Sequence, residues 1–415
     1  MKRAVITGMG AITPLGNNVQ DYWNGLLLGK SGAATITKFD PSNHKTKFAC
    51  EVKGFDPLPV IEKAEVRKYD LYAQYALLAA DECIKDSGLN LATSNLNRIG
   101  VIMATGIGGM LTFENEILSF GKNPQMPRFN PFFITKMIAN MATGQISIRY
   151  GFHGESYTTV SACSSSNHAI ANALNLIRLG KANIILAGGS EATITEAAIG
   201  GFNAMKALST LNDSPETACR PFDISRDGFV AGEGAGVLMI EELDHALARG
   251  AKIYCELAGY GAASDAYHVT ATHPDGLGAI LAMEEALNDS GLTIADVDYI
   301  NAHATSTPVG DISECIAIEK VFGSNLQRIK ISATKSMTGH LLGAAGAIES
   351  IACVKSIEQG KIPPTINLHE IDPAINSKLN ISVEKNYASN VKVALNNTFG
   401  FGGHTCTSIF KKFEK

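Results

Sequence analysis

The chain has 415 residues, of which 45% are hydrophobic and 18% are charged, and its formal net charge at pH 7 is −5. This length allows a large buried core in two or three domains, and the acidic balance argues against a nucleic-acid-binding protein. No apolar run approaches the roughly 18 residues of a membrane span, and the N-terminal run is too short for a signal peptide. We therefore expect a cytoplasmic protein that does not enter a membrane.

Strand-like apolar runs recur along the chain and alternate with helical patterns such as residues 69–89. A strand that is covered on both faces of a sheet is continuously apolar. The alternation of such strands with helices predicts an α/β architecture. The strand-like runs are 4–10, 98–109, 183–192, 236–243, 252–261 and 297–307.

Two similarities within the chain indicate an internal duplication. DECIKDSGL (81–89) and EEALNDSGL (284–292) share helical spacing and the same ending, and the helical patterns 164–180 and 343–360 both end in Gly-Lys. Helix ends can look alike by chance, but both pairs lie near half a chain length apart. We therefore predict two duplicated halves, 1–250 and 251–415.

The cysteines are irregularly spaced and form neither a CxxC pair nor a Cys/His zinc pattern. A disulfide framework is unexpected in a chain of this size, so we predict reduced thiols. The eight positions are 50, 83, 163, 219, 255, 315, 353 and 406.

One of these cysteines stands at an abrupt change of pattern in TTVSACSSSNHAIANAL (158–174). The stretch begins β-branched, and apolar residues at 170, 174 and 177 then give a helical spacing. Cys163 is thus expected at a helix N-terminus, where unpaired N–H groups would lower the thiol pKa and could bind an oxyanion. From this stretch alone, a small buried cysteine is the stronger interpretation and a nucleophile is the alternative.

A second candidate site is NAHATSTPVGD (301–311), where an apolar strand ends at His303 and hydroxyl residues follow. α/β proteins place functional residues at such strand ends, although an ordinary loop with a hydrogen-bonded histidine fits equally well.

A third candidate is SATKSMTGHLLGAAGAIES (332–350), which places Lys335 and His340 in a polar loop. The helix that follows is almost uncharged except for Glu349. A buried carboxylate needs a partner, and Lys335 or a backbone group is the expected one.

The fourth candidate is NNTFGFGGHT (396–405), where two phenylalanines alternate with glycines after a strand. Glycines let a backbone approach a ligand closely, while a β-bulge is the structural alternative. Other glycine clusters, TGIGG (105–109) and GEGAG (232–236), lack the complete dinucleotide-binding fingerprint, so no nucleotide cofactor is expected.

Together the four stretches resemble the β-ketoacyl-[acyl-carrier-protein] synthases, in particular those of dissociated bacterial fatty-acid synthesis. The similarity covers nearly the whole chain, from RAVITGMGAITPLGN through RPFDISRDGFVAGEGAG to NNTFGFGGHT. It implies the thiolase-like α/β fold: two similar five-stranded halves in a layered α-β-α-β-α arrangement, normally in a homodimer.

The resemblance also implies a role for each candidate. The nucleophile falls on Cys163, the two catalytic histidines on His303 and His340, and the lysine that positions and polarises His340 on Lys335. The buried glutamate falls on Glu349 and the gating phenylalanine on Phe401, with Phe399 beside it.

The implied reaction is a decarboxylative Claisen condensation. An acyl chain moves from the phosphopantetheine of an acyl carrier protein to Cys163, with the N–H groups of Cys163 and Phe401 as the oxyanion hole. Malonyl carrier protein then loses carbon dioxide while His303 and His340 donate hydrogen bonds to the developing enolate. The carbanion attacks the acyl-cysteine and gives 3-oxoacyl carrier protein, with no organic cofactor.

Further residues match binding positions of the family. Thr270, Thr305 and Thr307 are expected along the pantetheine arm, and Ile107, Phe133 and Phe202 along the acyl chain. The carrier protein is acidic, so a local basic patch is expected even on a net-negative enzyme. The basic residues at the family's docking positions are Arg67, Lys68, Arg128 and Lys206; each could also be an ordinary solvated charge.

The sequence departs from many relatives at Ala304, where glycine is frequent, and at Thr405, where asparagine is common. Some relatives bind a structural monovalent cation near the buried glutamate. Here Asn301, Glu349 and Asn396 could supply oxygens, while Thr405 removes one possible ligand.

Three alternatives share the fold. A degradative thiolase would need a second catalytic cysteine in its C-terminal half, and Cys406 lies outside the expected position. A non-catalytic chain-length factor would have lost the nucleophile, which is intact here. A ketosynthase of a polyketide or aryl-polyene pathway would perform the same chemistry on a different chain and stays open.

Overall fold

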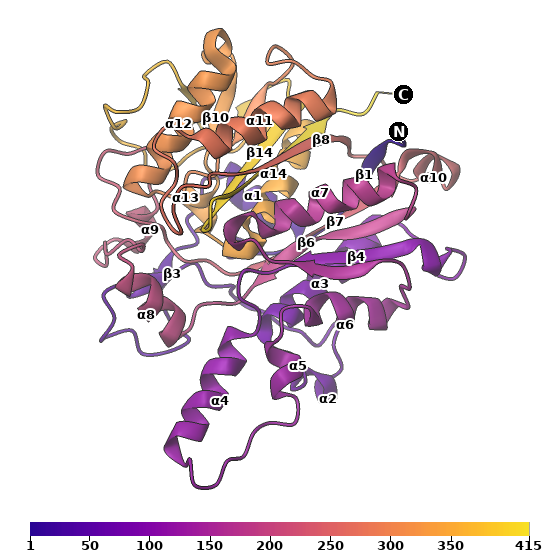
Figure 1. The fold of residues 1–415 in the computed structure, drawn as a ribbon, viewed down its shortest axis with the longest axis vertical. Helices are drawn as coiled ribbons and strands as arrows, with labels where there is room; N and C mark the ends of the chain where they lie inside the picture. The colour runs from indigo at the N-terminus through magenta and orange to yellow at the C-terminus, as the bar shows by residue number, and fades with distance from the viewer. Residues whose placement is uncertain (415) are drawn as a thin grey trace.

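The computed structural model describes residues 1–414 (Figure 1). The N-terminal part contains six principal helices around five principal strands. The strands are β1 (Ala4–Ile12), β4 (Ile99–Ala104), β5 (Ser156–Thr159), β6 (Ile184–Glu191) and β7 (Gly234–Glu242). The helices are α1 (Val19–Leu27), α3 (Leu71–Asp86), α4 (Met110–Lys122), α6 (Met141–Tyr150), α7 (Ser165–Arg178) and α8 (Glu196–Ala204). Shorter elements are β2 (Ala34–Thr35), β3 (Phe48–Ala49), α2 (Lys63–Val66), α5 (Phe133–Met137), α9 (Pro215–Ala218), α10 (Leu243–Ala248) and the 3₁₀ turns η1 (Leu96–Arg98) and η2 (Ala162–Ser164).

The C-terminal part repeats this plan with fewer insertions. Its main strands are β8 (Cys255–Ser264), β9 (Tyr299–Asn301), β10 (Lys330–Ser332), β14 (Val393–Gly400) and β15 (His404–Lys411). Its main helices are α11 (Leu277–Ser290), α12 (Pro308–Phe322) and α14 (Ala345–Gln359). Shorter elements are α13 (Lys335–Thr338), β11 (Lys361–Ile362), β12 (Asn380–Ile381), β13 (Tyr387–Ala388) and the 3₁₀ turns η3 (Gly323–Asn325) and η4 (Leu342–Ala344).

The two sets of strands have the same topology. In the first, the spatial order is β5-β4-β6-β7-β1, and in the second it is β10-β9-β14-β15-β8, with β12 added at the outer edge. Equivalent pairs of strands also have the same relative orientation in the two sets. β4 with β6 and β9 with β14 are parallel, whereas β6 with β7 and β14 with β15 are antiparallel. β1 and β8 join the sets edge to edge, so that one mixed sheet runs through the molecule.

The D-S-G-L repeat marks equivalent helix ends. After α3, Gly88 has φ +61°, and after α11, Gly291 has φ +66°, a left-handed conformation that glycine adopts most easily. The preceding serines repeat too: Ser87 Oγ donates to the carbonyl of Ile84, and Ser290 Oγ donates to that of Leu287. The predicted duplication is therefore visible in three dimensions.

Paired glycines bring each of these helices close to its strand. A Cβ at Gly10 of β1 would lie 1.9 Å from the Ala79 carbonyl oxygen, and one at Gly261 of β8 would lie 2.0 Å from that of Ala282. Only a residue without a side chain fits either position. α3 accordingly packs on β1 and β7, and α11 packs on β8 and β15.

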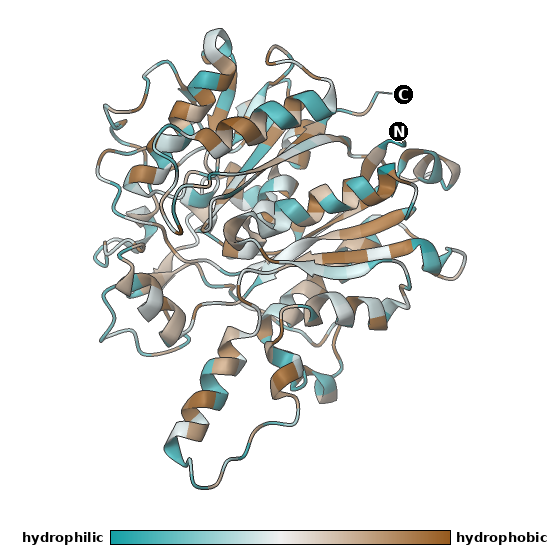
Figure 2. Ribbon diagram, viewed as in Figure 1, coloured by the Kyte–Doolittle hydropathy of each residue, from teal (hydrophilic) through white to brown (hydrophobic). Residues whose placement is uncertain are grey.

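α7 and α14 form the shared middle layer. α7 contacts β6 and β15, α14 contacts β14 and β7, and the two helices also contact each other. Their buried faces carry small and branched apolar residues, including Ala169, Ile170 and Ala173 of α7 and Ile348 and Ile351 of α14. Figure 2 shows the hydrophobic strands (brown) against which they pack. The α-β-α-β-α layering predicted from the resemblance is confirmed.

Two strands end sooner than the apolar patterns in the sequence predict. The run 98–109 forms a strand only to Ala104, and the run 297–307 forms one only from Tyr299 to Asn301. In the second case the chain turns at Ser306, where φ is +66°. Residues 302–307 thus form a loop that follows the carboxyl end of β9. The division at residue 250 stays a prediction; the link between α10 and β8 spans residues 249–254.

Within residues 1–414, the structure has no helix with the length and apolarity that a membrane crossing requires. All eight cysteines are free and buried.

Candidate active site

Cys163 lies in a sharp turn between β5 and α7. Ala162 has φ +50°, a strained value for a residue with a side chain. Ser165 holds the turn, because its Oγ accepts from the Ser161 N–H at 2.8 Å and donates to the Ala162 carbonyl at 2.6 Å. The polar stretch after the cysteine therefore builds the bend that presents the sulfur.

The second half contains the same turn without a nucleophile. Leu342, at the start of η4, has φ +47°, as Ala162 does at the start of η2. The residue at the place of Cys163 is then Gly343, and a Cβ there would lie 2.1 Å from the Gly106 nitrogen. The duplication thus yields one accessible nucleophile and one closely packed backbone contact.

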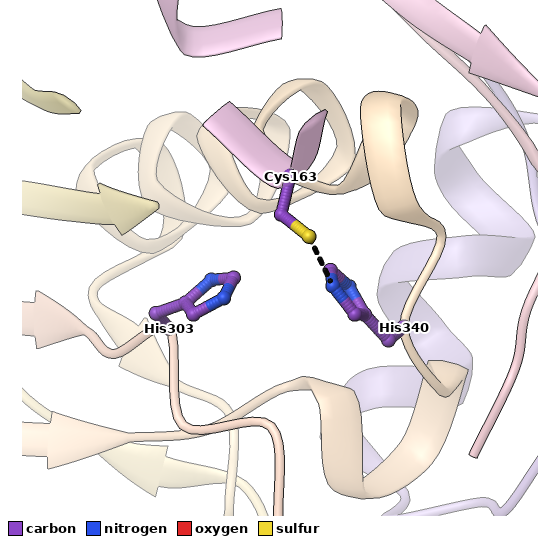
Figure 3. Close-up of side chains that lie close together, drawn as sticks. All are labelled: Cys163, His303 and His340. Atoms are coloured by element: carbon purple, nitrogen blue, oxygen red, sulfur yellow. Dashed lines mark hydrogen bonds between the residues drawn. The ribbon is translucent and has the colours of Figure 1, made fainter. Parts of the chain in front are cut away.

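Two histidines converge on the sulfur (Figure 3). His303 follows β9, and His340 lies between α13 and η4. His340 Nε2 is 2.9 Å from Cys163 Sγ, and one donor atom from each of the three residues lies within 4.8 Å of the others. The structure thus brings together residues that are up to 177 positions apart in the sequence.

Glu314, which the sequence analysis missed, fixes the loop of His303. Its carboxylate accepts from the His303 N–H at 2.8 Å and from the Ala304 N–H at 2.7 Å, and Asn397 Nδ2 donates to it at 3.2 Å. Burial raises the pKa of Glu314 to about 7. The only sequence signal was a carboxylate in a helix whose neighbours are apolar.

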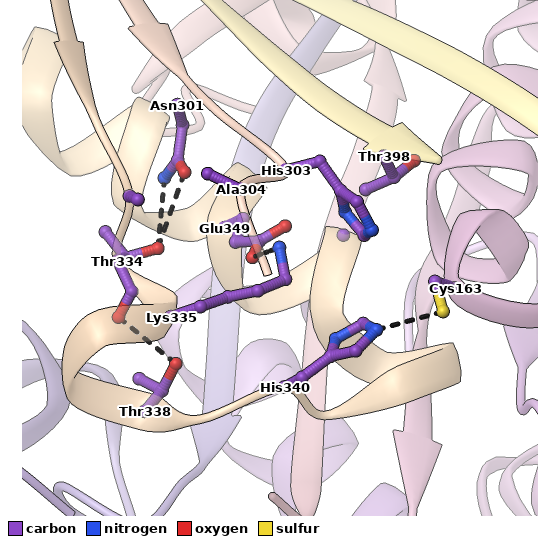
Figure 4. Close-up of polar contacts among 12 residues, drawn as sticks. Cys163, Asn301, His303, Ala304, Thr334, Lys335, Thr338, His340, Glu349 and Thr398 are labelled. Atoms are coloured by element: carbon purple, nitrogen blue, oxygen red, sulfur yellow. Dashed lines mark hydrogen bonds and ion pairs between the residues drawn. The ribbon is translucent and has the colours of Figure 1, made fainter. Parts of the chain in front are cut away.

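Lys335 forms a buried ion pair with Glu349 (Figure 4). Burial raises the pKa of Glu349 to about 7, although the lysine charge opposes this shift. The pairing expected from the sequence is confirmed. Within residues 1–414, Lys335 makes no hydrogen bond to His340, so its influence on the imidazole is through charge.

Both histidines are neutral at pH 7. Burial, followed by the positive charge of Lys335, holds the pKa of His303 and of His340 well below the ordinary value of 6.5. A neutral imidazole can donate one N–H to a developing oxyanion without an added proton.

The expected lowering of the Cys163 thiol pKa is wrong. Burial raises this pKa to about 12, and the charge of Lys335 and a hydrogen bond from the Phe401 N–H offset only part of the effect. Cys163 is 8% exposed and precedes α7 within a 3₁₀ turn, so loss of hydration outweighs the helix terminus. The resting residue is therefore a thiol, with its sulfur 2.9 Å from His340 Nε2.

The β14–β15 turn lies over the sulfur. The Phe401 N–H lowers the pKa of Cys163, which places it near the sulfur, and the Phe399 ring lies 5.6 Å from that of His303. A Cβ at Gly400 would lie 3.0 Å from the Cys163 nitrogen and 2.7 Å from the Ser161 carbonyl oxygen. Only a residue without a side chain therefore lets this turn approach the Cys163 segment so closely.

Gly400→Ala is expected to slow acyl transfer to Cys163 about 10²–10³-fold, because the methyl group would clash with the Ser161 carbonyl and push the Phe401 N–H away from the oxyanion. The rate of acyl-enzyme formation, followed by intact-protein mass spectrometry, measures the effect. Gly201→Ala in α8 is the matched control, since a Cβ there would meet nothing within 4 Å. Equal acylation rates in the two variants would contradict the assignment.

A cavity of about 590 Å³ connects the site with solvent. Beyond Cys163, His303, His340, Phe399 and Phe401, its lining includes Ile107, Phe202, Lys206, Thr270, Thr305 and Thr307 among the predicted residues. Phe229 also lines it and was missed; its ring lies 5.5 Å from that of His340. Phe133 does not line the cavity of its own chain: it stacks with Phe113 and Phe129 in the α4–α5 segment.

The RPFDISRDGF segment supports the predicted threonines. The buried Arg226 guanidinium donates to the carbonyls of Thr307 at 3.1 Å and Pro308 at 2.6 Å. The Arg220 N–H donates to Ser306 Oγ, and the Gly228 N–H donates to the Ser306 carbonyl. Residues 220–229, one of the stretches on which the family resemblance rests, thus shape one wall of the cavity.

The four predicted docking residues fall into two groups. Lys206 lies at the cavity, directly after α8. Arg67 and Lys68 follow α2, and Arg128 lies in the link between α4 and α5, which projects from the bottom of Figure 1. The Lys68 ammonium lies 5.8 Å from the centre of the Phe132 ring, which ties α2 to this segment.

The predicted cation ligands lie near the Lys335–Glu349 pair. Asn301 bonds with Thr334, and Asn396 Nδ2 donates to the Gly346 carbonyl at 2.8 Å. Within residues 1–414, Glu349 Oε2 and Asn396 Oδ1 are buried without a hydrogen-bond partner. The hydroxyl of Thr405 donates to the Gly278 carbonyl at 3.0 Å.

Comparison with known proteins identifies the family. Residues 1–246 match the N-terminal domain of β-ketoacyl synthases, and residues 254–369 match their C-terminal domain. The 3-oxoacyl-[acyl-carrier-protein] synthase 2 of Synechocystis sp. is 47% identical over 414 residues, covering 100% of this chain and 99% of that protein. The protein of the same name from Staphylococcus aureus is 47% identical over 416 residues, with the same coverage.

Solved structures support the same family assignment. A β-ketoacyl synthase from Burkholderia phymatum superposes with a TM-score of 0.92 at 33% identity, with full coverage of both chains. A type II polyketide ketosynthase, solved with its acyl carrier protein and bound to the hexaketide, superposes with a TM-score of 0.91 at 32% identity, also with full coverage. With the fold, the Cys-His-His site and matches along its whole length, this chain belongs to the β-ketoacyl synthase family.

Proposed function

We propose that the protein is a 3-oxoacyl-[acyl-carrier-protein] synthase 2, an acyltransferase that performs the elongation step of type II fatty-acid biosynthesis. It condenses an acyl chain, held on Cys163, with malonyl carrier protein to give 3-oxoacyl carrier protein and carbon dioxide. The observation that carries the proposal is the convergence of Cys163 with two neutral histidines at the base of a cavity of about 590 Å³. Full-length relatives at 47% identity support the same reaction.

Acyl transfer comes first. The Cys163 sulfur attacks the thioester carbonyl, a new S–C bond forms, and the pantetheine sulfur leaves. The thiol proton is transferred to the leaving pantetheine sulfur, which departs as a thiol. The N–H groups of Cys163 and Phe401 stabilise the tetrahedral oxyanion.

Condensation follows at the acylated cysteine. The C–C bond to the malonyl carboxylate breaks, carbon dioxide leaves, and the electron pair moves to the thioester oxygen as an enolate. His303 and His340 donate hydrogen bonds to that oxygen. The enolate carbon then attacks the acyl carbonyl, a C–C bond forms, and the S–C bond to Cys163 breaks. The Cys163 sulfur leaves as a thiolate and takes up a proton from water.

Lys335 adjusts the protonation of these donors. Replacing Lys335 by methionine removes a positive charge that lowers both histidine pKa values. The pKa values then rise, so any change in malonyl decarboxylation that accompanies histidine protonation should begin at a higher pH. In the wild type both histidines stay neutral between about pH 6 and 8, so their protonation should not change the rate in that range.

The pH profile of carbon dioxide release from malonyl carrier protein checks this prediction. Burial raises the Glu349 pKa, so without the lysine its carboxyl group takes up a proton and avoids an unpaired buried charge. Lys252→Met, at a largely exposed lysine, is the control and should retain the wild-type profile. An unchanged profile in Lys335→Met would refute the role of the charge.

Acyl carrier protein is the proposed partner, in its acyl- and malonyl-loaded forms. A relative that is 32% identical has been solved with its own carrier protein, which supports this assignment. Lys206 at the cavity and the group of Arg67, Lys68 and Arg128 are the proposed contacts. Thr270, Thr305 and Thr307 line the path that the pantetheine arm would take.

A homodimer is the proposed assembly. β5 ends the sheet and pairs only with β4 among the described strands, so its outer edge can pair with another chain. Val160 beside it is 58% exposed, and Ile148 of α6 is 77% exposed. Light scattering should give twice the chain mass of 43.9 kDa. We place the dimer in the cytoplasm, in keeping with eight free thiols.

A structural monovalent cation fits the buried oxygens near Glu349. Glu349 Oε2 and Asn396 Oδ1 lack hydrogen-bond partners within residues 1–414, and an ion would satisfy them, with Asn301 as a further oxygen source. It would supply charge compensation and take no part in bond making. Replacing potassium and sodium by a bulky organic cation should lower the melting temperature; an unchanged value would exclude this role.

A polyketide or aryl-polyene ketosynthase is the alternative. The relatives named for fatty-acid synthesis are 47% identical, whereas the polyketide ketosynthase structure is 32% identical, which favours fatty-acid elongation. Condensation of malonyl carrier protein with saturated acyl carrier proteins of graded length tests the choice. Two-carbon extension of these chains is expected. Extension of polyketide or polyene chains alone would overturn the proposal.

A further inference from the structure

The three residues at the base of the cavity also form a set of metal-binding atoms. A sulfur and two imidazole nitrogens lie within 4.8 Å of one another, and all three residues are buried. They come from three separate segments of the chain, so the tertiary structure alone creates the set. Catalytic zinc sites use three protein ligands of this kind, drawn from cysteine and histidine, and keep the fourth position open.

We propose that Cys163, His303 and His340 bind one Zn²⁺ or a similar borderline-soft divalent cation, which inhibits the enzyme by occupying its nucleophile. Zn–S and Zn–N bonds of about 2.3 and 2.0–2.1 Å place tetrahedral ligand atoms somewhat over 3 Å apart. His340 Nε2 is already 2.9 Å from Sγ. Small side-chain movements within the 4.8 Å limit complete the geometry, and the fourth position faces the cavity.

The ligands are in suitable protonation states, apart from the thiol. Both imidazoles are neutral, so each has a lone pair to offer a metal. When the metal binds, the S–H bond of Cys163 breaks, an S–Zn bond forms, and the proton leaves to solvent. The net reaction needs no oxidant or reductant.

The surroundings limit the affinity and explain why the metal would be an inhibitor, not a permanent component. Within residues 1–414, Nδ1 of His303 and Nδ1 of His340 have no hydrogen-bond partner, whereas permanent zinc sites fix this atom with an outer-shell acceptor. The positive charge of Lys335 opposes a dication, but Lys335 is paired with Glu349, and Glu191 also acts on Cys163.

Acylation should protect the enzyme. In the acyl-enzyme the sulfur belongs to a thioester and has lost its thiolate form, so the strongest ligand is gone. Hard cations such as Mg²⁺ prefer oxygen ligands and should not inhibit at this site.

The test uses the full-length enzyme after chelator treatment, with Co²⁺ as a spectroscopic probe and Zn²⁺ as the inhibitor. Titration with Co²⁺ should produce tetrahedral d–d bands and a thiolate-to-metal charge-transfer band that saturate at one bound ion per chain. Zn²⁺ in excess should abolish acyl transfer, with recovery on addition of EDTA. His303→Ala and His340→Ala should each weaken binding by at least the ~10–100-fold that loss of an outer-shell partner causes elsewhere.

Cys163→Ala should lose the charge-transfer band, whereas Cys83→Ala, which removes a buried thiol of α3, should keep it. Acyl-enzyme prepared before metal addition should resist Zn²⁺, a measurement that requires no variant. Three results would each overturn the proposal: the same cobalt spectrum in Cys163→Ala, more than one bound ion per chain needed for inhibition, or equal sensitivity of the acyl-enzyme to Zn²⁺. Failure of condensation without added metal would instead count against the proposed function.

Discussion

Replacing Cys163 by serine is expected to reduce acyl-enzyme formation and condensation by about 10⁴-fold or more. A serine hydroxyl is a much weaker nucleophile than a thiol, and the imidazole in contact with it, that of His340, has a pKa too low to make it a strong base. Cys163 is 8% exposed and serine is close to it in size, so the fold should be retained. Intact-protein mass spectrometry after incubation with acyl carrier protein measures the acyl adduct.

The wild type should gain a single acyl group, and peptide mapping should place it on Cys163. Cys83→Ala is the matched control, because it removes another buried cysteine from a helix outside the cavity. Its adduct should match that of the wild type. An acyl group on any of the other seven cysteines, or normal acylation of Cys163→Ser, would refute the assignment of the nucleophile.

Replacing His303 by alanine is expected to slow malonyl decarboxylation about 10²–10³-fold, equivalent to roughly 2.7–4 kcal/mol of transition-state stabilisation. The imidazole is proposed to donate to the enolate oxygen, where charge develops only during this step. Acylation of Cys163 should continue, since His340 is the imidazole that contacts the sulfur. Carbon dioxide release and acyl-enzyme formation, measured on the same preparation, separate the two steps.

His153→Ala is the control, because His153 is exposed and does not line the cavity. It should release carbon dioxide at the wild-type rate. Normal release by His303→Ala would contradict the proposed donor, and loss of acylation together with decarboxylation would show that His303 is needed for the nucleophile as well. Melting temperatures of both variants distinguish either result from unfolding.

The sequence predicted the fold for reasons that are local or periodic. Continuous apolar runs gave the covered strands, and the D-S-G-L repeat gave two equivalent helix ends, each with a glycine in the left-handed conformation. These signals depend on neighbouring residues along the chain, so they can be read without coordinates. The strand at 297–307 was predicted too long, since its apolar pattern did not reveal the turn at Ser306.

The sequence also identified Cys163, His303 and His340, but through the order of motifs and not through any view of their contact. Glu314, Phe229 and Arg226 were missed, because each acts on a segment that lies between 10 and 111 residues away. Phe133 was expected along the acyl chain, and the structure places it in the α4–α5 segment, outside the cavity of its own chain.

By itself, then, the sequence determined the α/β halves, their duplication and the identity of the reactive side chains. Only the tertiary structure decided how those side chains behave. It brings the two halves together so that His340 contacts Cys163, and it buries the sulfur deeply enough to raise its pKa to about 12 where the helix terminus predicted a decrease. The physical reason is that hydration and Coulomb interactions depend on distances in space, which residues far apart in the chain acquire only when it folds.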